Sequence, residues 1–477
     1  MTESRRASAR PWARLNPTDV MFLRLERPEW PCHYGILLVV DGRELIRGDG
    51  SVPLAQLQSI LAERVSSNPR LRRRIFEPGP FLGPPLWVDD AQFDIRSHVF
   101  ASAVPAPGAE SDLVATALDL YERPLDRSRP LWELWLLTEM ANGKVGVLLK
   151  LHHTVADGLA AIELAAALTD SGAATNTTPA PWNPLPVPSR RDLLAERLGS
   201  IRDHFRSDRS SPGPSPRPSR RSLSRTIGGF LGSGGATGFA LNARVRSGRR
   251  LARVELDVAS VKAVAHAHGG KINDVALALF AGGLRALLSA RGALQEHTQI
   301  AAGQTVTLRR PDDPRTIDNR VGSVILRLPA DEPDVAQRLQ AIIEQTSTAR
   351  SAQQPTAIMT VLAALSATPL GAFYSAHQRA GNVLCTNVRG PEEPVSIFGA
   401  PVESMLPIIE LVGNIAVTQI AFSYAGTLSL AITADATAFP DLRIVTSAMA
   451  HEWSVLAAGC GIAGHAEHGC WPVDEVR

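Results

Sequence analysis

The stretch LKLHHTVADGLAAIEL, Leu149–Leu164, decides the fold prediction. Two adjacent histidines, His152 and His153, follow a mostly apolar run from Val145 to Leu151, and a segment with helical periodicity begins at Gly158. This order predicts a strand, a short loop and a helix, with the histidines at the end of the strand. Strand ends held by a rigid scaffold are common positions for reactive side chains.

The two histidines are expected to have different roles. Adjacent residues in an extended segment point to opposite faces, so only one of His152 and His153 can face a given cleft while the other packs or braces. A neutral imidazole is a suitable general base near neutral pH. Asp157 follows across a turn, where it orients an imidazole or holds the loop by a salt bridge, and Gly158 permits tight backbone geometry at the start of the helix.

The residue pattern disfavours both simple packing and metal binding as the role of the histidine pair. A lone buried histidine is usually a core residue, but a pair followed by Asp-Gly after an apolar strand is harder to account for by packing alone. Neighbouring histidines on a strand diverge, and no third His or Cys lies at a usual ligand spacing. We therefore predict no metal site.

Composition excludes several classes of protein. The chain has 477 residues with 44% hydrophobic and 20% charged residues, enough for two ordinary domains with a large core. A formal net charge of +2 gives no case for nucleic-acid binding. The four cysteines are scattered without a C-x-x-C pair, which is typical of a reducing compartment.

No segment of the sequence predicts export or a membrane span. The N-terminus, MTESRRASARPWARL, is basic but lacks the apolar core of a secretory signal. The longest apolar candidate, Met405 to Phe422, contains Glu410, Asn414 and Gln419, and no window offers about 18 uninterrupted apolar residues. We expect a cytoplasmic protein, with peripheral contact to the inner face of the plasma membrane or to lipid inclusions as an option.

Changes in composition divide the chain into three parts. Residues 1–170 form an N-terminal lobe that contains the histidines, and residues 241–477 form a C-terminal lobe of alternating strands and helices. Residues 171–240 are rich in Pro, Ser, Gly and Arg, which predicts a linker because such a segment buries little apolar surface. Inside it, the basic amphipathic helix expected at 191–205 lies on an anionic membrane or packs back on the protein.

At the motif level the chain resembles a known enzyme family. HHTVADG, residues 152–158, matches the HHxxxDG motif of the CoA-dependent acyltransferase superfamily, which includes chloramphenicol acetyltransferase and condensation domains. Together with the other motifs, in this order, it resembles the bacterial wax ester synthase/diacylglycerol acyltransferase (WS/DGAT) family, except over residues 171–240. These motifs are LNPTDVMFLRLERPEWPCHYGILLVVDG (15–42), PLDRSRPLWELWLL (124–137), KINDVALALFAGGLRALL (271–288), TNVRGP (386–391) and ITADATAFPD (432–441).

The resemblance implies an α/β fold of two chloramphenicol-acetyltransferase-like lobes, joined by the long linker, with an active-site tunnel between them. His153 would lie in the middle of the tunnel as general base, with acyl-CoA entering from one face and the hydroxyl acceptor from the other. His152 would hold the loop. No cofactor is implied, because acyl-CoA is a substrate, and the sequence has no G-x-S-x-G elbow for an acyl-enzyme.

Secondary site residues are also implied by the resemblance. Asn273 and Asp274 open a long helix, with Asn273 as its N-cap, and they face the active site or serve capping alone. Arg309, at the end of a strand, would bond the motif aspartate. Asp126 and Arg129 are close enough to pair across the loop of PLDRSRP, near the active site or in a structural role.

The sequence thus predicts an acyl-CoA-dependent O-acyltransferase that forms triacylglycerol from diacylglycerol, wax ester from a long-chain alcohol, or both. One alternative is a glycerol-phosphate acyltransferase, which shares a short His-x4-Asp pattern but normally carries other sequence blocks that are missing from this chain. The other is a lipid-surface binding protein with little catalysis on the same scaffold. The intact HHxxxDG motif counts against it.

Overall fold

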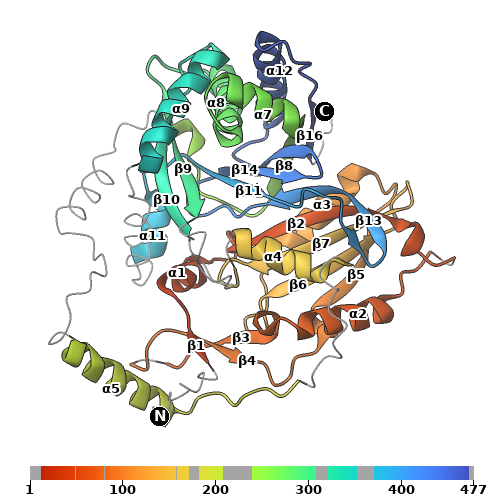
Figure 1. The fold of residues 1–477 in the computed structure, drawn as a ribbon, viewed down its shortest axis with the longest axis vertical. Coiled ribbons are helices and arrows are strands. Elements are labelled where there is room, and N and C mark those ends of the chain that lie inside the picture. The colour runs from red at the N-terminus through yellow and green to blue at the C-terminus, as the bar shows by residue number, and fades with distance from the viewer. Residues whose placement is uncertain are drawn as a thin grey trace, which may run out of the picture.

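The computed structural model describes residues 12–48, 50–79, 81–156, 158–170, 182–207, 239–307, 321–351 and 370–471. Two large mixed sheets form the centres of two lobes, one above the other in Figure 1. The six-stranded sheet has the order β12-β13-β2-β7-β6-β5, and the seven-stranded sheet has the order β10-β9-β11-β14-β15-β8-β16. The predicted α/β fold of two lobes is therefore confirmed.

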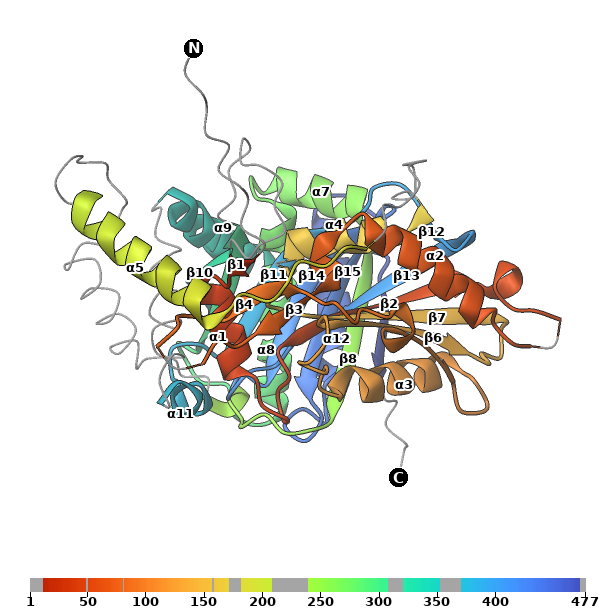
Figure 2. The same cartoon turned by 90° about the horizontal axis from the view of Figure 1, so that it is seen from below.

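The N-terminal lobe contains the six-stranded sheet, with α2 and α4 on one side and α3 on the other (Figure 2). Its helices are α1 (Pro17–Leu25), α2 (Leu54–Ser66), α3 (Glu110–Glu122) and α4 (Gly158–Leu168). The strands that this part of the chain contributes to the sheet are β2 (His33–Asp41), β5 (Val99–Ala103), β6 (Trp132–Thr138) and β7 (Lys144–His152).

Strand β7 lies in the interior of this sheet, between β2 and β6, which explains its almost continuous apolar sequence. Lys150 in this strand is fully buried and donates hydrogen bonds to the carbonyl oxygens of Leu120 (2.9 Å) and Arg123 at the end of α3. The negative end of the α3 dipole thus compensates the ammonium charge. Burial lowers the pKa of Lys150, and the nearby Glu133 carboxylate opposes that effect.

The C-terminal lobe packs α7, α8, α9 and α12 on one face of the seven-stranded sheet. A Cβ at Gly283 would lie 2.8 Å from the carbonyl oxygen of Val445, so glycine lets α8 and α12 approach closely. The helices are α7 (Val258–Ala267), α8 (Ile272–Ala290), α9 (Val335–Ser351), α11 (Leu370–His377) and α12 (Arg443–Gly459). The strands are β8 (Arg249–Asp257), β9 (Gln299–Thr307), β10 (Val321–Pro329), β11 (Val383–Arg389), β14 (Val417–Tyr424), β15 (Thr427–Asp435) and β16 (Glu467–Trp471).

Helix α8 is long and apolar enough to cross a membrane by length and composition. In the described structure 72% of its most apolar window is buried, against α7, α9, α12 and the sheet, as in the core helix of a globular lobe. The longest candidate from the sequence, Met405 to Phe422, contributes instead to two strands, β13 and β14.

The two sheets do not divide the chain at residue 240. Strands β12 (Ser396–Ile397) and β13 (Ala400–Ile408) come from the C-terminal part of the chain but belong to the N-terminal sheet. Strand β13 pairs antiparallel with β2, with Ile408 opposite Gly35. Residues that directly follow β13 are therefore carried to the start of β2 and the end of β7, where His33 lies opposite His152.

A third, three-stranded sheet supports the helix of the predicted linker. Strands β1 (Ala13–Arg14), β3 (Arg73–Phe76) and β4 (Leu86–Asp89) form this sheet, and α5 (Arg190–Ser207) lies against it. The buried Leu193 packs with Leu86 and Val88, and Arg14 forms a 2.8 Å ion pair with Glu196. Leu194 and Leu198 remain 48% and 66% exposed.

Several local predictions are wrong. The sequence from Ile95 to Val99 predicts a short strand, but the structure has a 3-10 turn (Ile95–Ser97) followed by β5. The sequence of the tail from Gly459 predicts no clear structure, but the tail adds the edge strand β16 to β8. Lys271, not Asn273, is the N-cap residue of α8. The sequence also predicts a helix over residues 357–366, and this stays a prediction because these residues lie outside the described part of the chain.

Candidate active site

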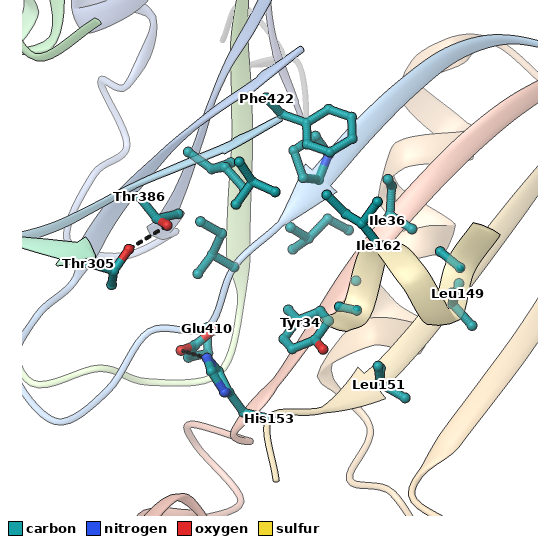
Figure 3. A pocket seen from close by; sticks show the side chains of 18 of the residues that line it. Tyr34, Ile36, Leu149, Leu151, His153, Ile162, Thr305, Thr386, Glu410 and Phe422 are labelled. Carbon is teal, nitrogen blue, oxygen red and sulfur yellow. Dashed lines mark hydrogen bonds and ion pairs between the residues drawn. The ribbon is translucent and has the colours of Figure 1, made fainter. Parts of the chain in front are cut away.

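His153 lies immediately after β7 and faces a cavity between the two lobes (Figure 3). Its backbone N–H donates to the carbonyl oxygen of Cys32 at 2.9 Å, which fixes the strand end. Its ring stacks on Phe22 of α1, with centroids 3.8 Å apart, and meets the edge of Tyr34 at 5.4 Å. The imidazole is held in one orientation by these contacts, and 16% of the side chain is exposed.

The cavity around His153 has a volume of about 140 Å³ and a mostly apolar lining. Both lobes contribute to it, as Figure 3 shows for Tyr34 and Ile162 on one side and Phe422 on the other. The polar lining on the C-terminal side includes Thr305 and Thr386, whose hydroxyl oxygens are 2.6 Å apart. The site thus offers a nitrogen base and hydroxyl groups inside an apolar chamber.

Glu410 lines this cavity but was not among the predicted site residues. It follows β13, is 5% exposed, and places its Oε1 atom 3.5 Å from Nε2 of His153 (Figure 3). In the sequence it stands out only as a polar interruption of the apolar run from Met405 to Phe422. That interruption was the available signal, but the pairing of β13 with β2 is needed to bring Glu410 to His153.

His152 points away from the cavity and is fully buried, as the alternation of side chains predicts. Its Nδ1 accepts a hydrogen bond from the backbone N–H of Thr154 at 3.1 Å, so the neutral ring carries its proton on Nε2. Nε2 lies 3.3 Å from Oε1 of Glu26, whose other oxygen accepts from Arg127 Nε at 3.0 Å. Burial lowers the pKa of His152, although the Glu26 carboxylate opposes it.

The loop after the histidines is held by Arg70. Its guanidinium donates to the carbonyl oxygens of Val155 (3.1 Å) and Thr154 (3.2 Å), and it lies 3.8 Å over the ring of Trp87. Arg70 belongs to the basic run before β3 and was not predicted as a site residue. Two charge-assisted hydrogen bonds and a cation–π contact make it a rigid support for the loop.

A second cavity of about 260 Å³ continues from the first along α4. The two share the lining residues Ile36, Leu149, Ile162, Ala165 and Phe422. Its lining is almost entirely apolar, which suits a hydrocarbon chain. Small alanines on α4 leave this space open, because larger side chains there would fill it.

A third cavity, of about 350 Å³, has a more polar lining and lies in the C-terminal lobe. It shares Thr305 with the His153 cavity and contains Asn273 and Asp274 in its lining. Asp274 Oδ2 accepts from the backbone N–H of Lys271 at 2.9 Å and Oδ1 accepts from the Thr346 hydroxyl at 2.9 Å. These bonds give Asp274 a capping and packing role, while Asn273 lines the cavity.

The remaining predicted site residues fall in different places. Asp126 and Arg129 form the expected pair, at 3.4 Å, but their side chains are 57% and 49% exposed and neither lines the cavities described above. Asp157 and Arg309 lie outside the described residues, as does their predicted pairing. Gly158 begins α4 as expected. Among the described residues, no group of three or more His, Cys, Asp or Glu side chains has the arrangement of a metal site.

Comparison with known sequences gives two family matches. The wax ester synthase/diacylglycerol acyltransferase catalytic domain matches residues 15–276, and the WS/DGAT C-terminal domain matches residues 317–456. A Mycobacterium tuberculosis H37Rv protein named "Probable diacyglycerol O-acyltransferase tgs1" is 29% identical over 413 residues, covering 84% of this chain and 86% of its own. A second protein of that strain, named as a probable diacylglycerol O-acyltransferase, tgs2, is 28% identical over 443 residues, covering 90% and 95%.

Comparison with solved structures gives the same fold. The wax ester synthase/diacylglycerol acyltransferase from Marinobacter aquaeolei VT8 matches with a TM-score of 0.65 and 24% identity, covering 94% of this chain and all of that one. The first condensation domain of the calcium-dependent antibiotic synthetase matches with a TM-score of 0.62 and 16% identity, covering 95% and 98%.

Proposed function

The chain belongs to the wax ester synthase/diacylglycerol acyltransferase family, and we propose that it transfers a long-chain acyl group from acyl-CoA to the hydroxyl of diacylglycerol, a long-chain alcohol, or both. The observation that supports this most strongly is His153, held at a strand end and facing an apolar chamber between the lobes. An imidazole in such a chamber is suited to deprotonating a hydroxyl substrate.

The proposed reaction is a single displacement. The hydroxyl gives its proton to Nε2 of His153 as its oxygen attacks the thioester carbonyl carbon. The carbon–sulfur bond then breaks and the ester is released. The CoA thiolate accepts the proton from the imidazolium. A positioned base of this kind contributes about two to four powers of ten in rate. No covalent enzyme intermediate or cofactor takes part.

The oxyanion formed in this step needs hydrogen-bond donors. The Thr305 and Thr386 hydroxyls face the same cavity as His153 from the opposite lobe. Their 2.6 Å contact leaves one of the two hydroxyl protons free for a substrate oxygen, since one hydroxyl donates to the other. We assign this pair as the donor, with the hydrocarbon tail of a substrate in the apolar cavity along α4.

The two alternative functions are less well supported. The relatives described above are named as diacylglycerol O-acyltransferases, not as glycerol-phosphate acyltransferases. The lipid-binding alternative leaves the orientation of His153 without a purpose, since a binding scaffold does not need a base beside an interlobe cavity.

Contact with a lipid surface is part of the proposal. Leu194 and Leu198 of α5 are 48% and 66% exposed, and Phe81, whose carbonyl oxygen accepts from Arg197, is 86% exposed. Large exposed apolar side chains beside arginines suit the interface of an anionic membrane. The helix packs on the protein through Leu193 and exposes Leu194 and Leu198 to solvent. Packing on the protein and contact with a membrane are therefore compatible.

Vesicle binding tests this contact separately from catalysis. Flotation with anionic phosphatidylglycerol vesicles should weaken for L194E/L198E, because two charges replace exposed apolar side chains. E63Q, a change to an exposed side chain on α2, serves as the control and should bind as the wild type does. Equal flotation of L194E/L198E and the wild type would contradict the proposed contact.

The function is tested by CoA release from palmitoyl-CoA by the purified protein. The assay compares a diacylglycerol, a long-chain alcohol and no acceptor. Release that depends on an acceptor, with the matching ester found by mass spectrometry, is the expected result and ranks the two acceptors. Folded protein that releases no CoA with either acceptor would contradict the proposal.

A further inference from the structure

Glu410 has an unusual environment for a carboxylate. Its side chain is 5% exposed in a mostly apolar cavity, with Oε1 3.5 Å from His153 Nε2. Its Oε2 atom is buried and has no hydrogen-bond partner among the described residues. A buried carboxylate costs free energy unless a nearby positive charge or hydrogen-bond donor compensates it.

The compensation available to Glu410 is His153. Within the described part of the chain, His153 is the basic side chain that lies within ion-pair distance of the Glu410 carboxylate. The field of Glu410 reaches further, since it contributes to raising the pKa values of the Cys32 thiol and the Tyr121 phenol, both raised mainly by burial. The carboxylate is therefore expected to favour positive charge on the facing imidazole.

We propose that Glu410 is a positioning residue that acts through His153: its carboxylate stabilises the imidazolium that forms when His153 accepts the proton of the acceptor hydroxyl. This inference rests on the proposed function. The imidazolium forms in a mostly apolar chamber, where an adjacent anion has a larger effect than in bulk water. The proton passes from the hydroxyl to Nε2 and then to the CoA sulfur, and no step transfers it to Glu410.

Among the described residues, the other titratable groups around His153 do not supply this anion. Behind it, His152 is buried and its lowered pKa keeps it neutral near pH 7, and Glu26 is held by His152 and Arg127. From β2, the Tyr34 hydroxyl donates to the Ala156 carbonyl.

Two further neighbours lie in the described part of the chain. The Cys32 thiol is buried with a raised pKa, and Arg70 binds the loop carbonyls and lies 3.9 Å from Asp19. Glu410 is thus the described carboxylate within ion-pair distance of the base.

The test compares Glu410→Gln with Glu410→Asp in the acyl-transfer assay across pH. The amide keeps the shape and removes the charge, so the base is weakened: we expect kcat to fall at least about tenfold with little change in the KM for acyl-CoA. The acid limb of the kcat/KM profile should move to lower pH, because an anion favours the protonated imidazole and its loss disfavours it. Glu410→Asp retains the charge, so its kcat and its acid limb should lie between those of Glu410→Gln and the wild type.

Controls distinguish the role of Glu410 from packing and from the function as a whole. Glu403→Gln makes the same chemical change at a glutamate on β13 that is 40% exposed and paired with Lys144. It should leave kcat and the pH profile unchanged. Thermal midpoints verify that each variant is folded. If Glu410→Gln unfolds, the kcat and pH profile of Glu410→Asp still test the inference. Wild-type kcat in Glu410→Gln, or a lower kcat without a moved acid limb, overturns the inference while the acyltransferase function stands. An inactive wild type contradicts the function.

Discussion

The brace behind the active site gives a prediction that can be worked out from the structure. Glu26 accepts from Arg127 Nε at 3.0 Å and lies 3.3 Å from His152 Nε2, and its side chain is 10% exposed. Burial alone would raise the pKa of Glu26, but the hydrogen bonds and charges of His152 and Arg127 outweigh it and lower the pKa from 4.5 to about 2. The perturbation that removes the charge and keeps the shape is Glu26→Gln.

The expected loss follows from linkage. A fall of the carboxyl pKa from 4.5 to about 2 corresponds to about 3 kcal/mol of folding free energy, at about 1.36 kcal/mol per unit of pKa. This is an upper limit. The electrostatic contribution of His152 to the lowered pKa of Glu26 requires a protonated imidazole, and burial lowers the pKa of His152. The folded pKa lies below the unfolded value, so the stabilisation is present in full above about pH 4.5 and shrinks as pH falls towards 2.

The assay is denaturant unfolding of the wild type and Glu26→Gln at pH 7 and at about pH 3.5, between the folded and unfolded pKa values. We expect the variant to be less stable by about 1 to 3 kcal/mol at pH 7, and by roughly three fifths of that difference at about pH 3.5. Glu63→Gln, at an exposed glutamate on α2, serves as the matched control and should change stability little. A Glu26→Gln loss no larger than that of the control, or one that grows as the pH falls, would refute the reasoning.

Three other substitutions test separate parts of the site. Arg70→Met removes two hydrogen bonds to loop carbonyls and the contact with Trp87, so we expect a loss of about 2 to 4 kcal/mol in unfolding free energy and lower kcat, with partial recovery in Arg70→Lys. Thr386→Val removes a proposed oxyanion donor and should lower kcat about 10²-fold with unchanged KM, measured by CoA release; an unchanged kcat would dismiss that role. Ala165→Phe should fill the passage between the two apolar cavities, so the ratio of kcat/KM for palmitoyl-CoA to butanoyl-CoA, or for long to short alcohols, should fall at least about tenfold; equal loss for long and short chains of both substrates would contradict this use of the cavity.

Local sequence patterns predicted the elements that depend on short-range order. Apolar periodicity and flanking residues predict helices from Gly158 to Leu168 and from Val335 to Ser351, and these are the bounds of α4 and α9. The orientation of His152 away from His153 followed from strand geometry alone. The position of Asp19 in the N-terminal motif predicts a structural role, and in the structure it completes a capping box with Asn16 at the start of α1.

The missed features depend on contacts between distant parts of the chain. Glu410 reaches His153 because β13 crosses to the other lobe and pairs with β2, which no local pattern predicts. Arg70 belongs to a run that looks like a solvated basic face, and only the fold places Trp87 and the loop carbonyls around it. The edge strand β16 contains Gly469 and is partly exposed, so it lacks the alternation that identifies a strand.

The assignment of His153 as the base is tested most directly by the kcat of His153→Ala. The variant is compared with the wild type and with Glu403→Gln, using mass spectrometry to quantify the ester formed from palmitoyl-CoA and the preferred acceptor. We predict a fall in kcat of about two to four powers of ten, with an unchanged thermal midpoint to within a few degrees. Ester formation by folded His153→Ala at the wild-type rate would contradict the assignment.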